Sequence, residues 1–335
     1  MLNGSLEAPL RIGNLELVHP LVLAPLAGIS DLPFRLLAKE QGCGLVFTEM
    51  ISAEGLTRNM KKTRKLLQTC PEERPLAIQI FGSRPEVLSG AAQIAEEWGA
   101  DIVDINMGCP VRKVVGGGSG AALLKDLDRL EETIRAVRKS ISIPLTIKIR
   151  SGWDEKNKNF LEVARMAQDL GVDALTIHGR TRTQGYGIPA DWDVIARVRE
   201  EVRIPVIGNG DLLSPQSILD FFGKTRCSGA MIGRGACGNP WLFRQSLNLL
   251  RGEPVNEPPL EEREATILRH LKMMVETRGE ARGVREFRKH LIWYTRRLRG
   301  SVDFRSQVHL WQRAAEVSEK IKEYFQNLSI RPLFS

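Results

Sequence analysis

The sequence of 335 residues is poor in cysteine and has no long apolar run. Its five cysteines form no Cys-X-X-Cys pair and match no common metal spacing, so we expect neither a bound metal nor a disulfide framework. Unpaired cysteines are typical of the reducing cytoplasm, where we expect the protein to reside. No stretch approaches the roughly 20 apolar residues that a membrane helix needs. The N-terminus also lacks the basic and apolar segments of a secretory signal.

Positive charge is in surplus. The sequence contains 48 lysines and arginines against 40 acidic residues, which gives a net charge of +8 and a pI of about 9.4. Such a surplus favours an anionic partner, with nucleic acid as the first possibility. The hydrophobic fraction of 42% is sufficient for a globular core. The length suits one large domain with a smaller one attached.

Short apolar segments alternate with helical patterns through the first 250 residues. The segments lack polar alternation, which indicates burial on both faces and therefore a parallel sheet. Eight strand-helix units in about 240 residues are typical of a closed (β/α)8 TIM barrel of the α/β class, with a doubly wound open sheet as the alternative. A hairpin over residues 10–18 precedes them, and we expect it to close the bottom of the barrel. The expected strands are 21–24, 45–48, 76–80, 102–105, 145–149, 174–177, 205–207 and 230–232.

The pattern changes near residue 250, so we predict a barrel domain over 1–250 and a small all-α helical bundle over 251–335. Glycine and proline between 252 and 259 indicate a linker. The second part holds 17 lysines and arginines against 12 acidic residues. If one helix continues through Gly279 and Gly283, then Arg278, Arg282, Arg285 and Lys289 share a face. That face, with Arg288 nearby, either contacts phosphates of a nucleic acid or is an ordinary solvated helix surface.

The functional side chains of a TIM barrel gather at the carboxyl ends of its strands. Lys148 lies within an apolar run, where a charge is costly unless it is paired. Gly210 and Gly233 follow the seventh and eighth strands, and their backbone N–H groups are placed to bind a phosphate. These features predict a mononucleotide cofactor across the barrel mouth. Lys148 would place positive charge where a reduced flavin develops negative charge.

Two further polar side chains stand at such ends. Gln79 offers an amide for the edge of a ring, and His178 would contact the phosphate or the ring edge. Each has a structural alternative, because Gln79 is also a plausible core amide and His178 a plausible structural histidine. Residues 209–211 alone could form only a turn. The coincidence of all these residues at strand ends favours the cofactor site.

Cys109 follows the fourth strand directly and precedes a glycine-rich loop at 116–120. A cysteine in this place can reach over the mouth of the barrel. The glycine run is no Walker loop, because no Lys-Ser or Lys-Thr follows it. It is no convincing dinucleotide fingerprint either, because no suitably placed acidic residue lies on a next strand.

Four motifs resemble those of the tRNA-dihydrouridine synthases, and most of all the bacterial B-type branch. The likeness extends over nearly the whole chain, and the string Asn-Met-Gly-Cys-Pro is its most specific part. We find no departure from the family pattern in these motifs. They are Ala24-Pro25-Leu26-Ala27-Gly28-Ile29-Ser30-Asp31, Asp104-Ile105-Asn106-Met107-Gly108-Cys109-Pro110, Ile207-Gly208-Asn209-Gly210-Asp211 and Met231-Ile232-Gly233-Arg234-Gly235.

This resemblance implies an FMN oxidoreductase that reduces the C5=C6 bond of uridines in the tRNA D-loop to 5,6-dihydrouridine. Reduced FMN would deliver hydride to C6, Cys109 would deliver the proton to C5, and NADPH would reduce the FMN again. A thiol suits this task, because its ordinary pKa of about 8.5 leaves it protonated at neutral pH. The resemblance also implies contacts for individual residues: Pro25, Leu26 and Ala27 along the flavin, Gln79 and Lys148 at its polar edge, Asn209, Gly210, Asp211, Gly233 and Arg234 at its phosphate, and Asn106 and Arg150 at the uracil.

Two other functions fit part of the pattern. An FMN barrel acting on a small pyrimidine, similar to dihydroorotate dehydrogenase, fits the strand ends but gives the basic helical part no purpose. A non-catalytic RNA-binding protein fits the basic helices but gives no reason for Cys109 and Lys148. We therefore expect a tRNA-modifying enzyme whose basic residues Arg282, Arg285, Arg288 and Lys289 contact the tRNA backbone.

Overall fold

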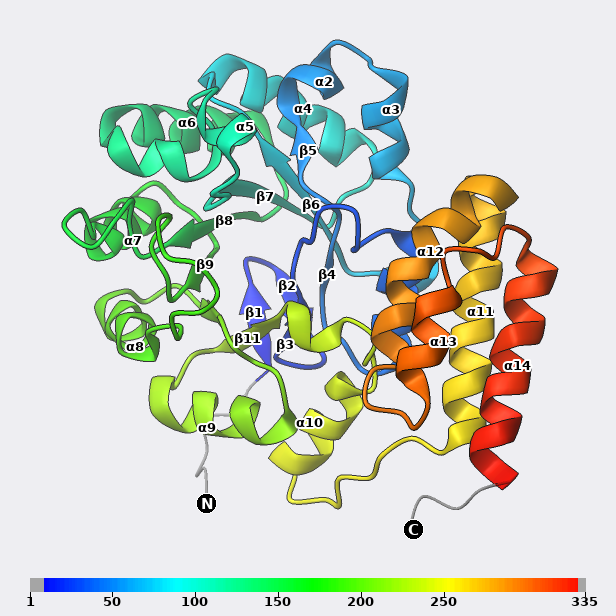
Figure 1. Cartoon of the computed structure of the whole chain (residues 1–335). Helices are drawn as coiled ribbons and strands as arrows, with labels where there is room; N and C mark the ends of the chain where they lie inside the picture. Colours follow the sequence, from blue (N-terminus) through cyan, green and yellow to red (C-terminus); the bar gives the residue numbers. More distant parts are fainter. Residues whose placement is uncertain (1–8, 331–335) are drawn as a thin grey trace.

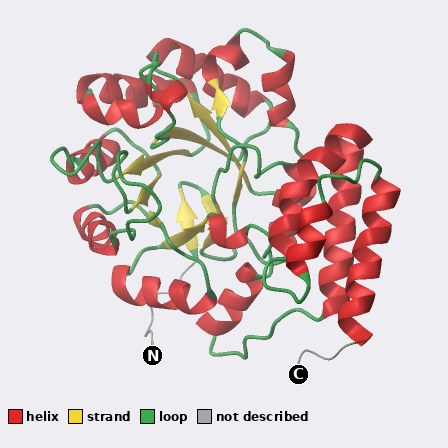
Figure 2. Cartoon of the chain, viewed as in Figure 1, coloured by secondary structure: helices red, strands yellow, loops and turns green. Residues whose placement is uncertain are grey.

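A computed structural model of the chain describes residues 9–330. Within these residues, eight parallel strands form a closed ring with helices around the outside (Figures 1 and 2). Each ring strand pairs with the one before it in sequence, and the last, β11, pairs with the first, β3. Between β3 and β4 the N–H of Leu23 donates to the carbonyl oxygen of Leu45 over 2.9 Å. The predicted TIM barrel is confirmed, and the open-sheet alternative is wrong.

The ring strands bring their carboxyl ends to one mouth of the barrel. They are β3 (Leu21–Leu23), β4 (Val46–Phe47), β6 (Leu76–Phe81), β7 (Ile102–Met107), β8 (Leu145–Arg150), β9 (Ala174–His178), β10 (Val206–Asn209) and β11 (Gly229–Ile232). A short strand, β5 (Ile51–Ser52), pairs with the end of β6.

Most of the helices that surround the ring follow a strand and pack on its outer side. They are α1 (Leu32–Glu40), α2 (Ala53–Thr57), α3 (Lys61–Arg64), α4 (Pro85–Glu97), α5 (Arg112–Val115), α6 (Leu127–Ser140), α7 (Phe160–Asp169), α8 (Trp192–Glu201), α9 (Pro215–Thr225) and α10 (Leu242–Leu250). The 3-10 turns are η1 (Lys65–Leu67), η2 (Pro71–Glu73), η3 (Gly120–Lys125) and η4 (Arg234–Ala236).

Side-chain caps define where several of these helices begin. Ser214 and Ser217 form a capping box at the start of α9, so that two backbone N–H groups find side-chain acceptors. The Asp126 side chain accepts from the N–H of Arg129, and α6 therefore begins at Leu127, although its apolar pattern extends back to residue 123. The residues before this cap form η3 instead.

The N-terminal hairpin closes the lower end of the barrel, as predicted. Its strands are β1 (Leu10–Ile12) and β2 (Leu15–Leu17). The buried side chains of Leu10, Ile12 and Leu17 pack in one cluster with residues of the ring strands, among them Val22 and Phe47. Water is thereby excluded from the end of the barrel opposite the strands' carboxyl ends.

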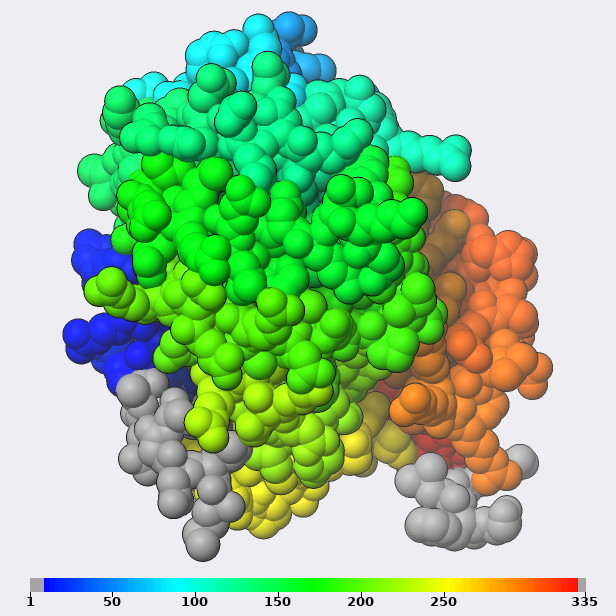
Figure 3. Space-filling view, turned by 90° about the vertical axis from the view of Figure 1, so that its left-hand side faces the viewer, coloured from blue at the N-terminus to red at the C-terminus, as the bar shows by residue number. Residues whose placement is uncertain are grey.

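Residues 260–330 form a group of helices with no strand in the part of the chain that the structure describes. They are α11 (Leu260–Arg278), α12 (Glu280–Tyr294), α13 (Ser301–Gln307) and α14 (Ala314–Ile330). Their buried residues form a separate cluster that also takes in Trp241 beside α10. The group lies at one side of the barrel, where α11 packs against α1 (Figures 1 and 3). The residues between Leu250 and Leu260 belong to neither helix nor strand, which fits the expected linker.

The single helix through Gly279 and Gly283, which was the condition for a shared basic face, is not present. Gly279 has φ +78°, a backbone conformation outside the helical region, and it ends α11 and starts α12. Gly283 lies within α12. A Cβ at this position would lie only 2.7 Å from the Met274 carbonyl oxygen on α11. Glycine at 283 thus permits the close approach of the two helices. No helix among residues 9–330 is both long and apolar enough to cross a bilayer.

Candidate functional site

The carboxyl ends of the ring strands surround a cavity of about 390 Å³. All but one of the residues expected to act in catalysis or to bind cofactor or uracil line this cavity. They are Pro25, Leu26 and Ala27 after β3, Asn106 and Cys109 from β7 and its loop, Lys148 and Arg150 on β8, His178 on β9, Asn209, Gly210 and Asp211 from β10 and its loop, and Gly233 and Arg234 after β11. The exception, Gln79 on β6, is fully buried below the cavity.

Lys148 and Asn209 form the polar part of the cavity wall. The Lys148 Nζ donates to Asn209 Oδ1 over 3.1 Å, and Asn209 Nδ2 donates to the Met231 carbonyl oxygen over 2.7 Å. Burial, and the nearby charge of Arg150, lower the pKa of Lys148 to about 8. An ammonium has three N–H donors, so the group keeps donors for a ligand in the cavity.

His178 presents a neutral imidazole beside Lys148. Burial, with Lys148 and Arg150 as the next two causes, lowers the pKa of His178 well below its ordinary value. Its Nδ1 is buried and finds no hydrogen-bond partner among residues 9–330. A buried polar atom without a partner is costly, and a ligand that pairs with it would remove this cost.

The Cys109 thiol is unpaired and partly exposed at the cavity. Burial raises the pKa of Cys109 above its ordinary value, so the thiol is protonated at neutral pH. Two side chains fix its loop. Asn106 Oδ1 accepts from the N–H of Cys109 over 2.9 Å, and Arg150 Nε donates to the Gly108 carbonyl oxygen over 2.8 Å. Gly120, at φ +61°, lets the chain return beneath the loop, since a Cβ there would lie 2.9 Å from the Cys109 carbonyl oxygen.

Asp211 holds two guanidinium groups at the β10 side of the cavity. Its carboxylate accepts from Arg180 Nη2 over 2.6 Å and 2.8 Å and from Arg234 Nη2 over 2.9 Å. The expected phosphate end is therefore positively charged, and the side chain of Asp211 orients the two arginines. Arg180 Nη1 has no partner in the described part of the chain, and the Tyr186 ring lies 4.0 Å from the Arg234 guanidinium.

Several residues of this site were not singled out from the sequence. Arg180 follows His178 closely, and its place after a strand end was the available signal. Tyr186 lies in an irregular loop with no motif around it. Asp104, in the same motif as Cys109, is fully buried below the cavity and receives the Gln79 amide, which also contacts Asn106. Gln79 therefore stands one layer behind the cavity wall.

The basic residues of the helical part differ in what they contact. Arg282 pairs with Glu286 over 2.6 Å, Arg288 Nη2 donates to the Trp311 carbonyl oxygen over 2.9 Å, and Lys289 donates to the Gly28 carbonyl oxygen. Arg285 is exposed and makes no hydrogen bond or ion pair within residues 9–330. Arg288 and Lys289 thus also support the fold.

A basic cleft of about 430 Å³ lies between the barrel and α12. Lys62 and Lys65 come to it from α3 and η1, and Arg278, Arg282 and Arg285 come from the helical part. This juxtaposition was not expected, because residues 61–65 carry no motif. Arg278 and Arg282 have carboxylate neighbours, whereas Lys62, Lys65 and Arg285 make no ion pair within residues 9–330, and this unpaired charge favours an anionic occupant.

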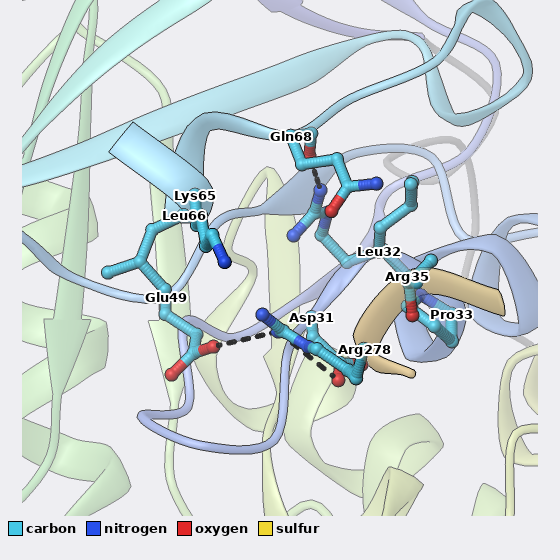
Figure 4. A pocket seen from close by; sticks show the side chains of 10 residues that line it. Asp31, Leu32, Pro33, Arg35, Glu49, Lys65, Leu66, Gln68 and Arg278 are labelled. Atoms are coloured by element: carbon cyan, nitrogen blue, oxygen red, sulfur yellow. Dashed lines mark hydrogen bonds and ion pairs between the residues drawn. The ribbon is translucent and has the colours of Figure 1, made fainter. Parts of the chain in front are cut away.

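Arg278 joins the helical part to the barrel next to this cleft. Its Nη2 lies 3.6 Å from Asp31 Oδ2 and 4.0 Å from Glu49 Oε1, and its side chain is only 10% exposed (Figure 4). Arg278 therefore does not belong to a solvated face with Arg282 and Arg285, as a continuous helix would have required.

The protein is a TIM-barrel protein with a ligand site at one mouth of the barrel. A thiol, a lysine and two arginines bound by Asp211 stand at this mouth. The profile of the dihydrouridine synthase (Dus) family matches residues 22–329, and the chain belongs to this family. It is 40% identical over 316 residues to tRNA-dihydrouridine synthase B of Pseudomonas aeruginosa, covering 94% of this chain and 95% of the other. A probable tRNA-dihydrouridine synthase of Rickettsia bellii is 39% identical over 324 residues, covering 95% and 98%. The B-type enzyme of Pasteurella multocida is 41% identical over 297 residues, covering 88% and 90%.

Solved structures resemble the fold at low sequence identity. A 2-naphthoyl-CoA reductase complex has a TM-score of 0.57 at 14% identity, over 75% of this chain and 52% of the other. The old yellow enzyme homologue of Zymomonas mobilis has a TM-score of 0.53 at 14% identity, over 77% and 96%. At this identity the likenesses show the fold alone.

Proposed function

We propose that the protein is a flavin-dependent tRNA-dihydrouridine synthase that reduces the C5=C6 bond of uridines in the tRNA D-loop and takes its electrons from NADPH. The observation that carries the proposal is the meeting of Cys109 and Lys148 in one cavity of a dihydrouridine synthase barrel. The names of the relatives from Pseudomonas aeruginosa and Pasteurella multocida support the same activity.

The residues of the cavity fit an FMN. His178 Nδ1, a buried polar atom without a partner in the described chain, belongs to a side chain that lines the cavity and is of the kind that a polar group of a ligand would engage. Lys148 would hold the polar edge of the ring, and Asn209 and Arg234 with the backbone of Gly210 and Gly233 would hold the phosphate. When bound, the reduced flavin supplies the hydride that reaches C6 of the uracil.

Cys109 would supply the proton that C5 of the uracil requires. The thiol is suited to this because its raised pKa keeps it protonated at neutral pH. Asn106 and Arg150 fix the loop that bears it and would restrict the base to one position. The base must leave its stack to enter the cavity, which costs a few kcal/mol in a duplex and less in a loop.

We place a domain boundary near residue 250 and assign tRNA docking to the helical domain over 251–335 together with the basic cleft. Lys62, Lys65, Arg282 and Arg285 would contact phosphates of the tRNA backbone, because their charges line one surface and are largely exposed. These contacts would offset the cost of unstacking the target base.

The test is reduction of tRNA by the purified protein. We expect a yellow protein that, with NADPH, converts uridines to dihydrouridine in tRNA from cells lacking this protein, as detected by mass spectrometry of the digested tRNA. Oxidation of NADPH with free pyrimidines in place of tRNA would instead support a small-molecule enzyme. A colourless protein that binds tRNA and leaves it unmodified would refute any catalytic function.

A further inference from the structure

Asp104 is a buried carboxylate without an ion pair. The side chain lies on β7, is 0% exposed, and makes no salt bridge within residues 9–330. Its two oxygens accept from Thr146 Oγ1 over 2.6 Å and from Gln79 Nε2 over 2.7 Å. Burial raises the pKa of Asp104 to about 7, and Lys148 is the charged neighbour that opposes this shift. A carboxylate in such a place is costly, and Thr146 and Gln79 alone offer no reason for a charge.

Asp104 begins a path of hydrogen bonds that ends at the cysteine loop. Gln79 Oε1 accepts from Asn106 Nδ2 over 2.8 Å. Asn106 Oδ1 in turn accepts from the N–H of Cys109 over 2.9 Å and from the N–H of Gly108 over 3.2 Å. The path crosses from β7 to β6 and back to β7, and each amide uses its NH2 on one side and its oxygen on the other.

The direction of this path depends on the carboxylate. The Asp104 oxygen that faces Gln79 acts as an acceptor, so the Gln79 NH2 faces Asp104 and the Gln79 oxygen faces Asn106. The Asn106 oxygen is then left for the two backbone N–H groups. Without an acceptor at position 104, nothing holds the Gln79 NH2 in place, and a turned Gln79 would reverse Asn106 and place the Asn106 NH2 opposite the N–H of Cys109. The loop would lose its acceptor.

We propose that Asp104 is a positioning residue that, through Gln79 and Asn106, holds the backbone of the Cys109 loop at the cavity. The effect on tRNA reduction rests on the proposed function of Cys109, whereas the effect on the loop does not. Thr146 binds the other carboxylate oxygen and lies outside the path, so it offers a matched control.

The test compares Asp104→Leu, which removes the acceptor for Gln79, with Thr146→Val in two measurements. The first is deuterium uptake by the backbone over residues 106–112 in the protein without flavin. We expect Asp104→Leu to speed exchange at Gly108 and Cys109 about tenfold, as for the loss of one hydrogen bond, and Thr146→Val to leave it unchanged. The second is a single turnover of tRNA by flavin-saturated, pre-reduced enzyme, which we expect to slow about 10–100-fold only in Asp104→Leu.

A second variant separates the path from general stability. Gln79→Met leaves Asp104 in place and interrupts the path at its next member, so it should produce the same increase in exchange at Gly108 and Cys109. If Asp104→Leu does not fold, Gln79→Met provides the test.

Three results would overturn the proposal: unchanged exchange at Gly108 and Cys109 in Asp104→Leu, equal effects of Asp104→Leu and Thr146→Val, or unchanged exchange in Gln79→Met. If the wild-type protein forms no dihydrouridine, the proposed function fails, and the exchange measurement still decides whether Asp104 holds the loop.

Discussion

The Lys148 ammonium donates to the side-chain oxygen of Asn209 over 3.1 Å, from β8 across β9 to β10. Asn209 cannot turn away, because its NH2 donates to the Met231 carbonyl oxygen on β11. Three strands thus fix one positive charge at the cavity wall. A fixed charge is more effective toward a ligand than a mobile one, since little conformational entropy is lost on binding.

This arrangement predicts how flavin binding depends on pH. Because the pKa of Lys148 is lowered to about 8, the amine is charged below that pH and loses its proton above it. We expect the affinity of the flavin-free protein for FMN to fall between pH 7 and 9.5. Lys148→Met should bind FMN more weakly and with little change over the same range. Quenching of flavin fluorescence measures the FMN affinity of the wild type and of Lys148→Met. Parallel pH curves for the two proteins would contradict the prediction.

Cys109→Ala should separate the two halves of the reaction. We expect reduction of bound flavin by NADPH to continue, because the thiol has no part in it, and tRNA reduction to fall by about 10²–10⁴-fold with the loss of a general acid. Stopped-flow absorbance follows the first step, and dihydrouridine content follows the second. Cys237→Ala is the matched control, since this cysteine does not line the cavity. Full tRNA turnover in Cys109→Ala would remove the thiol from the mechanism.

Charge reversal at Arg285 should weaken tRNA binding without harming the fold. The side chain is exposed and unpaired in the described structure, so Arg285→Glu changes charge alone. We expect weaker tRNA binding. The slope of the logarithm of the binding constant against the logarithm of the salt concentration should become shallower by about one, as for the loss of one phosphate contact. Lys65→Glu, across the basic cleft, should act in the same direction. Lys139→Glu on α6 makes the same charge change on an exposed site elsewhere and should bind as the wild type does.

A substitution of Arg288 should affect the stability of the fold as well as tRNA binding. Its guanidinium donates to the Trp311 carbonyl oxygen, so Arg288→Glu would also disturb the chain before α14. A loss of thermal stability should accompany any loss of tRNA binding there. Binding that is insensitive to salt in the wild-type protein would contradict the electrostatic docking of all these residues.

The sequence sufficed for the barrel because its strands are unbroken apolar runs and each is followed by a helical pattern. Residues at the strand ends, such as Lys148 and Cys109, could be found for the same reason, since the topology brings all eight ends together. Arg180 and Asp104 could not be assigned, because their contacts are made by side chains from other strands. The break at Gly279 depended on a backbone angle that a glycine permits and does not require.

His290 lies in the contact between the helical part and the barrel, and it predicts how stability depends on pH. Its ring is buried against Phe34 of α1 and against His270, and neither ring nitrogen has a partner among residues 9–330. Burial is the largest cause that lowers the pKa of His290 well below 6.5. The folded protein therefore keeps the ring neutral while the unfolded chain takes up a proton below pH 6.5, and stability is lost as the pH falls.

His290→Phe should remove this loss. The substitution replaces two unpartnered polar atoms by apolar ones in a ring of similar shape, so we expect a gain of about 1–2 kcal/mol at pH 7.5 if the larger ring is accommodated. Between pH 6.5 and pH 5.0 the difference in free energy of unfolding between the variant and the wild type should grow by about 2 kcal/mol. The reason is that the variant takes up no proton at this position on unfolding. Urea unfolding at pH 7.5, 6.5 and 5.0 measures both quantities. His309→Phe, at an exposed position, is the control and should keep the pH dependence of the wild type. The decisive result is the change in how the free energy of unfolding depends on pH. A misfit of the larger ring would lower the free energy of unfolding equally at all three pH values. An unchanged pH dependence would mean that the folded protein protonates His290.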